Sequence, residues 1–119
     1  MRNFRELEVW NEARALVKDV YLLTKGLPDE EKYGLTSQIR RCVISIPANI
    51  AEGSAKDSQK DFSRYLQISL GSSFELESHV LLAVDLGILP QSDATEILQN
   101  LERLQKKLNS FIKYVSSQF

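Results

Sequence analysis

The sequence has little of several residue types on which common classes of protein depend. Its 119 residues include one cysteine and one histidine. A single cysteine excludes an intrachain disulfide and favours a reducing cytoplasm. No apolar run approaches the roughly 18 residues that cross a bilayer, so we expect no membrane partner. The first ten residues, MRNFRELEVW, lack the apolar stretch that is typical of a signal peptide.

Sequence motifs that carry catalysis or hold a cofactor are also missing. The chain has no glycine-rich phosphate loop and no GxSxG nucleophile motif. His79 has no second histidine to pair with, and the Glu75–His79 spacing differs from the Glu-x-x-His pairs of di-iron bundles. Cys42 falls among apolar positions, which predicts an inert packing residue. We therefore expect no catalytic site, no metal site, no cofactor and no enzymatic activity.

Breaks in the chain are few, because there are only 5 glycines and 3 prolines. Between them, apolar residues recur at helical spacing over about residues 6–25, 35–55, 59–86 and 93–116. Ser58, with Asp61 three residues later, predicts the start of the third helix, and Ser92 is the predicted N-cap of the fourth. The short connections predict an all-α, antiparallel up-down four-helix bundle as a single domain over residues 1–119.

The second and third helices carry more apolar residues than one side of a bundle helix can bury. Each has a core stripe, yet further apolar residues lie on the opposite side, where solvent is expected. This surplus predicts a subunit interface. The candidate interface residues are Ile44, Ala48, Ala51, Ile68, Leu82 and Leu86.

Two features of these helices favour unusual packing. Pro47 lacks the N–H that would bond to the carbonyl of Val43, so a kink is expected in the second helix, with nearby polar side chains satisfying that carbonyl. Gly71, flanked by serines in the third helix, predicts a close approach of another helix.

A polar stripe runs beside the core stripe of the second helix, at spacings of three and four residues. Either this stripe is a solvated face or it is a partly buried polar network whose partners lie on another helix, another subunit or a ligand; we favour the network. Its members are Gln38, Arg41, Ser45, Asn49 and Glu52.

The net charge of −1 removes the simplest argument for nucleic-acid binding, a strongly basic chain. Local basic positions nevertheless remain. The fourth helix presents Arg103, Lys106 and Lys107 opposite its core stripe, and Arg40 lies off the core stripe of the second helix. In an oligomer each basic patch would repeat, and multivalency strengthens weak contacts. These four residues are the candidate contacts to RNA or DNA, and a nucleic-acid-binding protein is the other possible partner.

The segment YGLTSQIRRCVISIPANIAEGSA (residues 33–55), together with FRELEVWNEA and DFSRYLQISLGSSFELE, resembles the bacterial four helix bundle protein family. That family includes proteins encoded in intervening sequences of large-subunit ribosomal RNA genes. It is similar to the accessory variability determinant of diversity-generating retroelements. The resemblance implies an up-down bundle assembled into a ring of five subunits, with a role in binding nucleic acid. The alternative is a protein–protein interaction scaffold that has no nucleic-acid contact.

Overall fold

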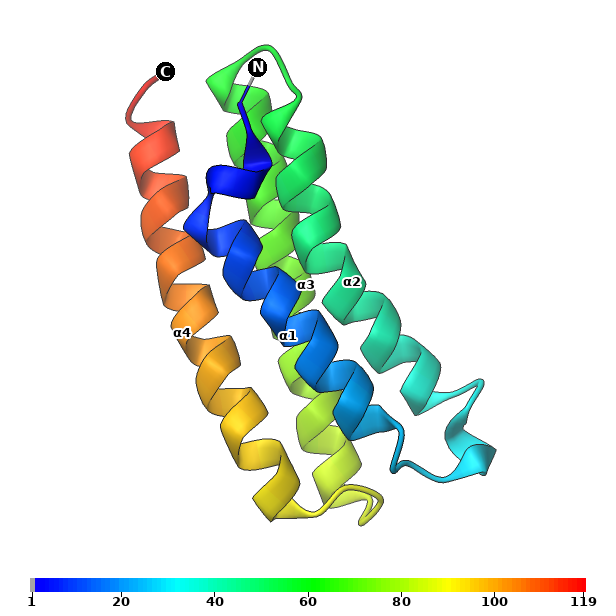
Figure 1. The fold of residues 1–119 in the computed structure, drawn as a ribbon. Coiled ribbons are helices and arrows are strands. Elements are labelled where there is room, and N and C mark those ends of the chain that lie inside the picture. Colours follow the sequence, from blue (N-terminus) through cyan, green and yellow to red (C-terminus); the bar gives the residue numbers. More distant parts are fainter. Residues whose placement is uncertain (1) are drawn as a thin grey trace.

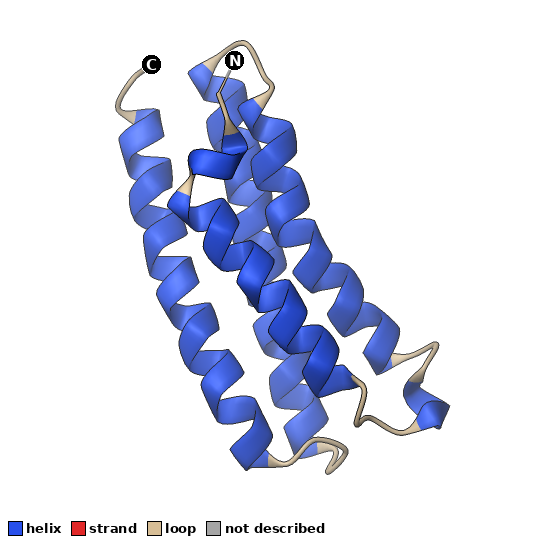
Figure 2. Cartoon of the chain, viewed as in Figure 1, coloured by secondary structure: helices blue, strands red, loops and turns tan. Residues whose placement is uncertain are grey.

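The structure, a computed structural model, describes residues 2–119 and contains helices but no strand among them. Four long helices follow one another along the chain (Figures 1 and 2). They are α1 (Glu8–Thr24), α2 (Leu35–Ser54), α3 (Gln59–Asp85) and α4 (Gln91–Ser116). Two short 3₁₀ helices, η1 (Phe4–Glu6) and η2 (Asp29–Glu31), precede α1 and α2. The predicted all-α four-helix bundle is confirmed.

Successive helices run in opposite directions and pack as neighbours, as short connections require. Both α1 and α3 contact α2 and α4, so α1 and α3 occupy diagonal corners of the bundle. The two ends of the chain lie at the same end of the bundle as the α2–α3 connection (Figure 1). The molecule is elongated, with extents of 46 × 23 × 19 Å.

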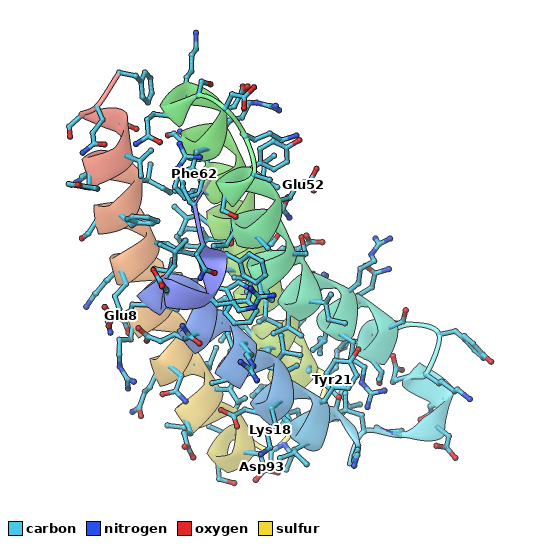
Figure 3. All side chains as sticks on the ribbon, turned by 45° about the horizontal axis from the view of Figure 1, so that its top comes forward. Glu8, Lys18, Tyr21, Glu52, Phe62 and Asp93 are labelled. Carbon is cyan, nitrogen blue, oxygen red and sulfur yellow. The ribbon has the colours of Figure 1, made fainter. Side chains whose placement is uncertain are left out.

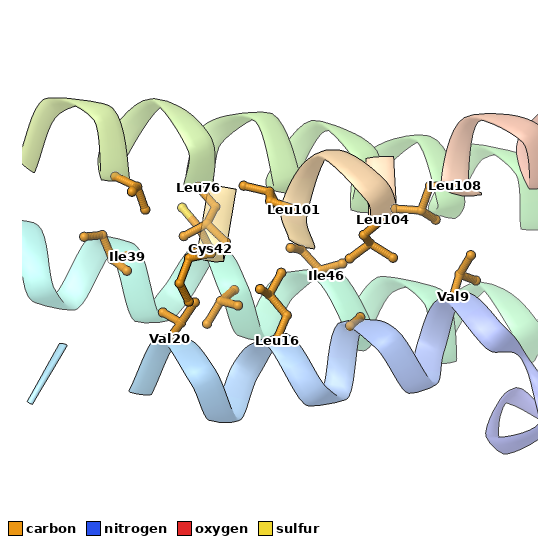
Figure 4. Packing of buried hydrophobic residues seen from close by; sticks show 14 of the residues in the cluster. Val9, Leu16, Val20, Ile39, Cys42, Ile46, Leu76, Leu101, Leu104 and Leu108 are labelled. Atoms are coloured by element: carbon orange, nitrogen blue, oxygen red, sulfur yellow. The ribbon is translucent and has the colours of Figure 1, made fainter. Parts of the chain in front are cut away.

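The core lies on the bundle axis, and every long helix contributes to it. Its members are apolar residues spaced by three, four or seven along each helix, which places them on one face. Figure 4 shows Leu16 and Val20 of α1, Ile39 and Ile46 of α2, Leu76 of α3, and Leu101 and Leu104 of α4 meeting in this interior. The expected burial of Cys42 in this layer is confirmed, because its side chain is only 4% exposed.

The helix ends show which local signals determine the boundaries. Ser58 caps α3 as predicted, because its Oγ accepts a hydrogen bond from the Asp61 N–H at 3.0 Å. The prediction that Ser92 caps α4 is wrong. Pro90 holds the N-cap position, and α4 begins at Gln91. Proline suits a helix start because its ring sets φ and the N–H that it lacks would have no partner there.

Gly53 and Gly71 both lie inside helices, but they differ in how closely a neighbouring helix approaches them. Gly53 of α2 packs against α3 so closely that an added Cβ would lie 2.6 Å from Tyr65 Cβ and 3.2 Å from Phe62 Cδ1. Gly71 is exposed, and a Cβ there would meet nothing within 4 Å. The predicted close approach at Gly71 is therefore wrong within the subunit. Of the two glycines, Gly53 is the one at which α2 and α3 approach each other closely.

Pro47 lies inside α2, which is helical from Leu35 to Ser54. The polar residues that were expected to satisfy the Val43 carbonyl bond elsewhere. The Asn49 Nδ2 donates to the Ser45 carbonyl at 2.8 Å and to the Ser45 Oγ at 2.9 Å. The kink at Pro47 stays a prediction.

Candidate functional site

The helices α2 and α3, together with Leu86 directly after α3, carry large aliphatic side chains on the outside of the bundle. Ile44 is 45% exposed, Ile68 43%, Leu82 47% and Leu86 69%. Ala48 is also exposed and Ala51 is half-buried. All six are candidate interface residues, and we call them the α2–α3 apolar surface. None of the six is fully buried within the subunit, so this surface is available for contact with another molecule.

The polar stripe of α2 is divided by the structure. At its centre, Ser45 Oγ hydrogen-bonds to Ser72 Oγ of α3 at 2.9 Å, and Asn49 bonds back to Ser45. At its ends the contacts are weaker. The exposed Arg41 donates to Gln38 Oε1 at 3.4 Å, and Glu52 is exposed on the outer side of α2 (Figure 3). The stripe is thus a small α2–α3 network flanked by solvated groups.

The basic residues of α4 differ in their freedom to bind a ligand. Arg103 and Lys106 are exposed; Arg103 donates to Asn100 Oδ1 at 3.2 Å, and Lys106 lies 3.3 Å from Glu102. Lys107 is engaged by α1, where its ammonium pairs with Glu8 and Glu12. The sequence does not indicate these ion pairs between α1 and α4, because Lys107 and the two carboxylates are far apart in the chain.

The contacts of Lys107 shift the pKa values of the groups that they join. Contact with Glu12 and then Glu8 raises the pKa of the Lys107 ammonium. Its contact with Lys107 in turn lowers the pKa of Glu8. Glu8 lies on the side of α1 toward α4 (Figure 3). The Glu12 Oε2 is 2.6 Å from the ammonium, yet it lacks good hydrogen-bond geometry, so we describe this contact as an ion pair.

Arg40, the candidate contact that lies off the core stripe of α2, is half-buried against α1. Its Nε donates to Thr24 Oγ1 at 2.8 Å, and its guanidinium lies 4.6 Å from the centre of the Tyr21 ring. A hydrogen bond and a cation–π contact together hold the side chain in place. Arg40 therefore serves the α1–α2 contact in this structure and is a poorer candidate for phosphate binding than Arg103.

Arg2 has an anchoring role that the sequence does not indicate. Its guanidinium donates to the carbonyls of Ser54 at 3.3 Å and Lys56 at 2.8 Å, and to Gln59 Oε1. It also lies 4.3 Å from the centre of the Phe62 ring. These contacts fasten the N-terminal segment to the α2–α3 connection.

Three side chains with metal-ligand atoms meet between α2 and α3. The Cys42 sulfur, a Glu75 carboxylate oxygen and a ring nitrogen of His79 all lie within 4.8 Å of one another. Cys42 and His79 are far apart in the sequence, and only the packing of α2 against α3 brings the two side chains together. Burial, followed by the charge of Glu75, raises the pKa of the Cys42 thiol to about 11.

No helix in the described part of the chain combines the length and the apolar character needed to cross a membrane. A groove of about 450 Å³ lies between the start of α1 and the C-terminal half of α4, with Leu7, Val9 and Phe111 among its lining. The groove also contains the acidic Glu8 beside Lys107. Its lining includes equal numbers of acidic and basic residues, so the groove presents no net charge to a ligand.

Comparisons with known proteins agree with this fold. Residues 5–110 match the model of the family described as 23S rRNA-intervening sequence protein. The structure is similar to the crystal structure of a protein with unknown function from the S23 ribosomal protein family of Bacteroides thetaiotaomicron VPI-5482. The identity is 28% and the TM-score 0.81, covering 88% of this chain and 98% of the other. A comparison with curated proteins gives no match.

Proposed function

The chain belongs to the 23S rRNA-intervening sequence protein family, and we propose that it is a non-enzymatic binding module that assembles with copies of itself. The α2–α3 apolar surface carries this proposal. Its four large aliphatic side chains are each more than 40% exposed in the subunit. Covering such side chains removes apolar area from water at roughly 25 cal/mol per Å², which favours association.

The occupant proposed for this surface is a second copy of the chain, continuing around a ring of five subunits. The number five rests on the resemblance to four helix bundle proteins. The six residues of the surface are themselves uncharged, and charged residues lie beside and between them: Arg41 and Glu52 on α2, and the exposed Glu75 between Ile68 and Leu82 along α3. Interfaces between subunits typically combine apolar and polar side chains in this way.

The second part of the proposal is that the assembly engages nucleic acid. Arg103 and Lys106 remain exposed on α4, and phosphate groups are recognised by such donors. One subunit offers few contacts, so binding would depend on the repetition of these residues around the assembly. The family name refers to 23S rRNA, which makes ribosomal RNA the first probe to test.

Assembly is tested by placing a charge on the apolar surface. We expect Ile44→Glu to lower the mass measured by light scattering while circular dichroism keeps the helical signal, because burying an unpaired charge costs several kcal/mol. Leu22→Glu is the matched control, since Leu22 of α1 is 57% exposed but lies outside the α2–α3 apolar surface. A wild-type monomer, or an unchanged mass in Ile44→Glu, would contradict this interface.

The alternative function is a protein–protein scaffold that has no nucleic-acid contact. The acidic neighbours of the α4 cations, Glu8, Glu12 and Glu102, favour this alternative. Binding of the wild-type protein to ribosomal RNA and duplex DNA at about 50 mM salt distinguishes the two functions, because electrostatic contacts are strongest at low salt. Absence of binding with an intact oligomer would support the scaffold.

A further inference from the structure

The cluster of Cys42, Glu75 and His79 is formed by two helices that pack side by side. Cys42 belongs to α2, whereas Glu75 and His79 lie one turn apart on α3. The His79 Nε2 is 3.5 Å from Glu75 Oε2. Figure 4 shows the Cys42 sulfur in the interior beside Leu76, on the α3 side of α2. The cluster thus spans from the edge of the core to the exposed carboxylate of Glu75.

The imidazole of His79 has no hydrogen-bond partner among residues 2–119. Both ring nitrogens, Nδ1 and Nε2, are buried and unpaired, although the side chain as a whole is 21% exposed. The Glu75 oxygen is near Nε2 but is not placed for a hydrogen bond. Buried polar atoms in native proteins nearly always have a partner. The unpaired nitrogens therefore point to a missing ligand.

We propose that Cys42, Glu75 and His79 bind a zinc-class divalent cation that joins α2 to α3. Thiolate, imidazole and carboxylate are the three side-chain ligands that Zn²⁺ accepts, and Co²⁺ binds the same donor set. On binding, a sulfur–metal bond replaces the S–H bond of Cys42 and the proton leaves to solvent. Three protein ligands leave a fourth tetrahedral position for water, reached from the exposed side of Glu75.

The geometry requires little movement to receive the ion. Bonds of 2.0–2.3 Å in a tetrahedral site place ligand atoms roughly 3.3–3.8 Å apart. The His79–Glu75 pair already satisfies this spacing at 3.5 Å. The remaining pairs, within 4.8 Å, must close by no more than about 1 Å, which small side-chain rotations on two helices supply.

This site is independent of the proposed nucleic-acid binding and is tested by spectroscopy on the full chain without a histidine tag. Titration with Co²⁺ should give one equivalent per chain and a thiolate-to-cobalt charge-transfer band in the near ultraviolet. Because Cys42 is the single cysteine, that band reports on this residue. Zn²⁺ should displace Co²⁺, and its affinity is measured by competition with a chromogenic chelator.

Variants separate a built site from chance binding. Cys42→Ser should abolish the charge-transfer band. His79→Gln and Glu75→Gln should each weaken Zn²⁺ binding by more than the roughly 10- to 100-fold that follows when a residue supporting a metal ligand is removed. Glu96→Gln, an exposed carboxylate of α4, is the control and should bind as the wild type.

Two results would overturn the site. One is a wild-type cobalt complex without a sulfur charge-transfer band. The other is an affinity for Zn²⁺ that His79→Gln and Glu75→Gln leave unchanged. Circular dichroism of the metal-free variants checks the fold. If Cys42→Ser unfolds, the Glu75 and His79 variants still decide, because their side chains lie nearer the surface.

Discussion

Gly53 illustrates how one residue determines the distance between two helices. It allows α2 to approach the backbone of α3 near Phe62 and Tyr65. We expect Gly53→Ala to lower the free energy of unfolding by about 1–3 kcal/mol, as overpacking does, because the new Cβ would lie 2.6 Å from Tyr65 Cβ. Urea denaturation monitored by circular dichroism measures the change.

Gly71→Ala is the matched control for Gly53→Ala. The substitution is the same, and Gly71 lies on α3, the helix against which Gly53 of α2 packs. No atom lies within 4 Å of the added Cβ, and alanine is a better helix former than glycine by about 1 kcal/mol. We therefore expect Gly71→Ala to be as stable as the wild type or more stable. Equal destabilisation in both variants would contradict the close contact at Gly53.

The sequence alone does not distinguish these two glycines. Both lie in segments with helical periodicity, and both have small neighbours. What separates them is the side of the helix that meets the neighbouring helix, and this depends on how α2 and α3 rotate about their axes. The cluster around His79 was missed for the same reason, since Cys42 reaches His79 only through that packing.

At the scale of helices, the ion pairs of Lys107 join the start of α1 to α4. The lowered pKa of Glu8 adds stability above its ordinary pKa of 4.5, and this stability is lost as the pH falls through the lowered value. The raised pKa of Lys107 adds stability below its ordinary pKa of 10.5, and this stability is lost at still higher pH. The pairs therefore stabilise the fold between these two limits.

We expect Lys107→Met to lower the melting temperature slightly at pH 7, and to do so less at high salt, because exposed ion pairs are weak and screened. The difference from the wild type should begin to shrink as the pH falls below 4.5, the ordinary pKa of Glu8, and should be lost as the pH falls through the lowered pKa of the folded state. Calorimetry across pH 3–9, a range chosen to include the ordinary pKa of a carboxylate, measures it. A difference that is independent of pH would indicate a loss of packing instead.

Most element boundaries could be predicted because they depend on local chemistry. The capping of α3 by Ser58 and the end of α3 near Gly87, which adopts a positive φ of 74°, follow from residue type. The start of α4 was misplaced because Pro90 and Ser92 are both acceptable at a helix start, and only the path of the chain from Leu89, buried in the core, selects the proline. The contacts of Lys107 and Arg2 depend on tertiary packing and carry no local signal.

At the scale of the whole molecule, the core is complete inside one subunit, yet apolar side chains remain outside it. Large residues such as Phe62 and Leu104 are fully buried, so the surplus on α2 and α3 does not reflect a failure to fill the core. This surplus could be inferred from the sequence because a bundle helix buries one face. The partner and the geometry of any assembly could not, because a single chain contains no second copy.

Arg103 and Lys106, two exposed basic residues of α4, are the expected contacts to nucleic acid. We expect Arg103→Glu combined with Lys106→Glu to weaken binding to ribosomal RNA or DNA and to flatten its dependence on salt. On duplex DNA the slope should decrease by about 0.9 for each phosphate that the variant no longer neutralises, and light scattering should show an intact oligomer. Arg103 and Lys106 are exposed, and the acid beside Lys106 lies on its own helix.

Lys107→Met and Arg40→Gln are the informative controls, because both side chains already have partners on α1. Each should reduce stability more than it reduces the salt slope. The opposite pattern, in which these two variants flatten the slope and the Arg103–Lys106 double variant does not, would mean that nucleic acid displaces the α1 contacts. Binding would then require α1 to separate from α2 and α4, and the exposed face of α4 would not be the contact surface.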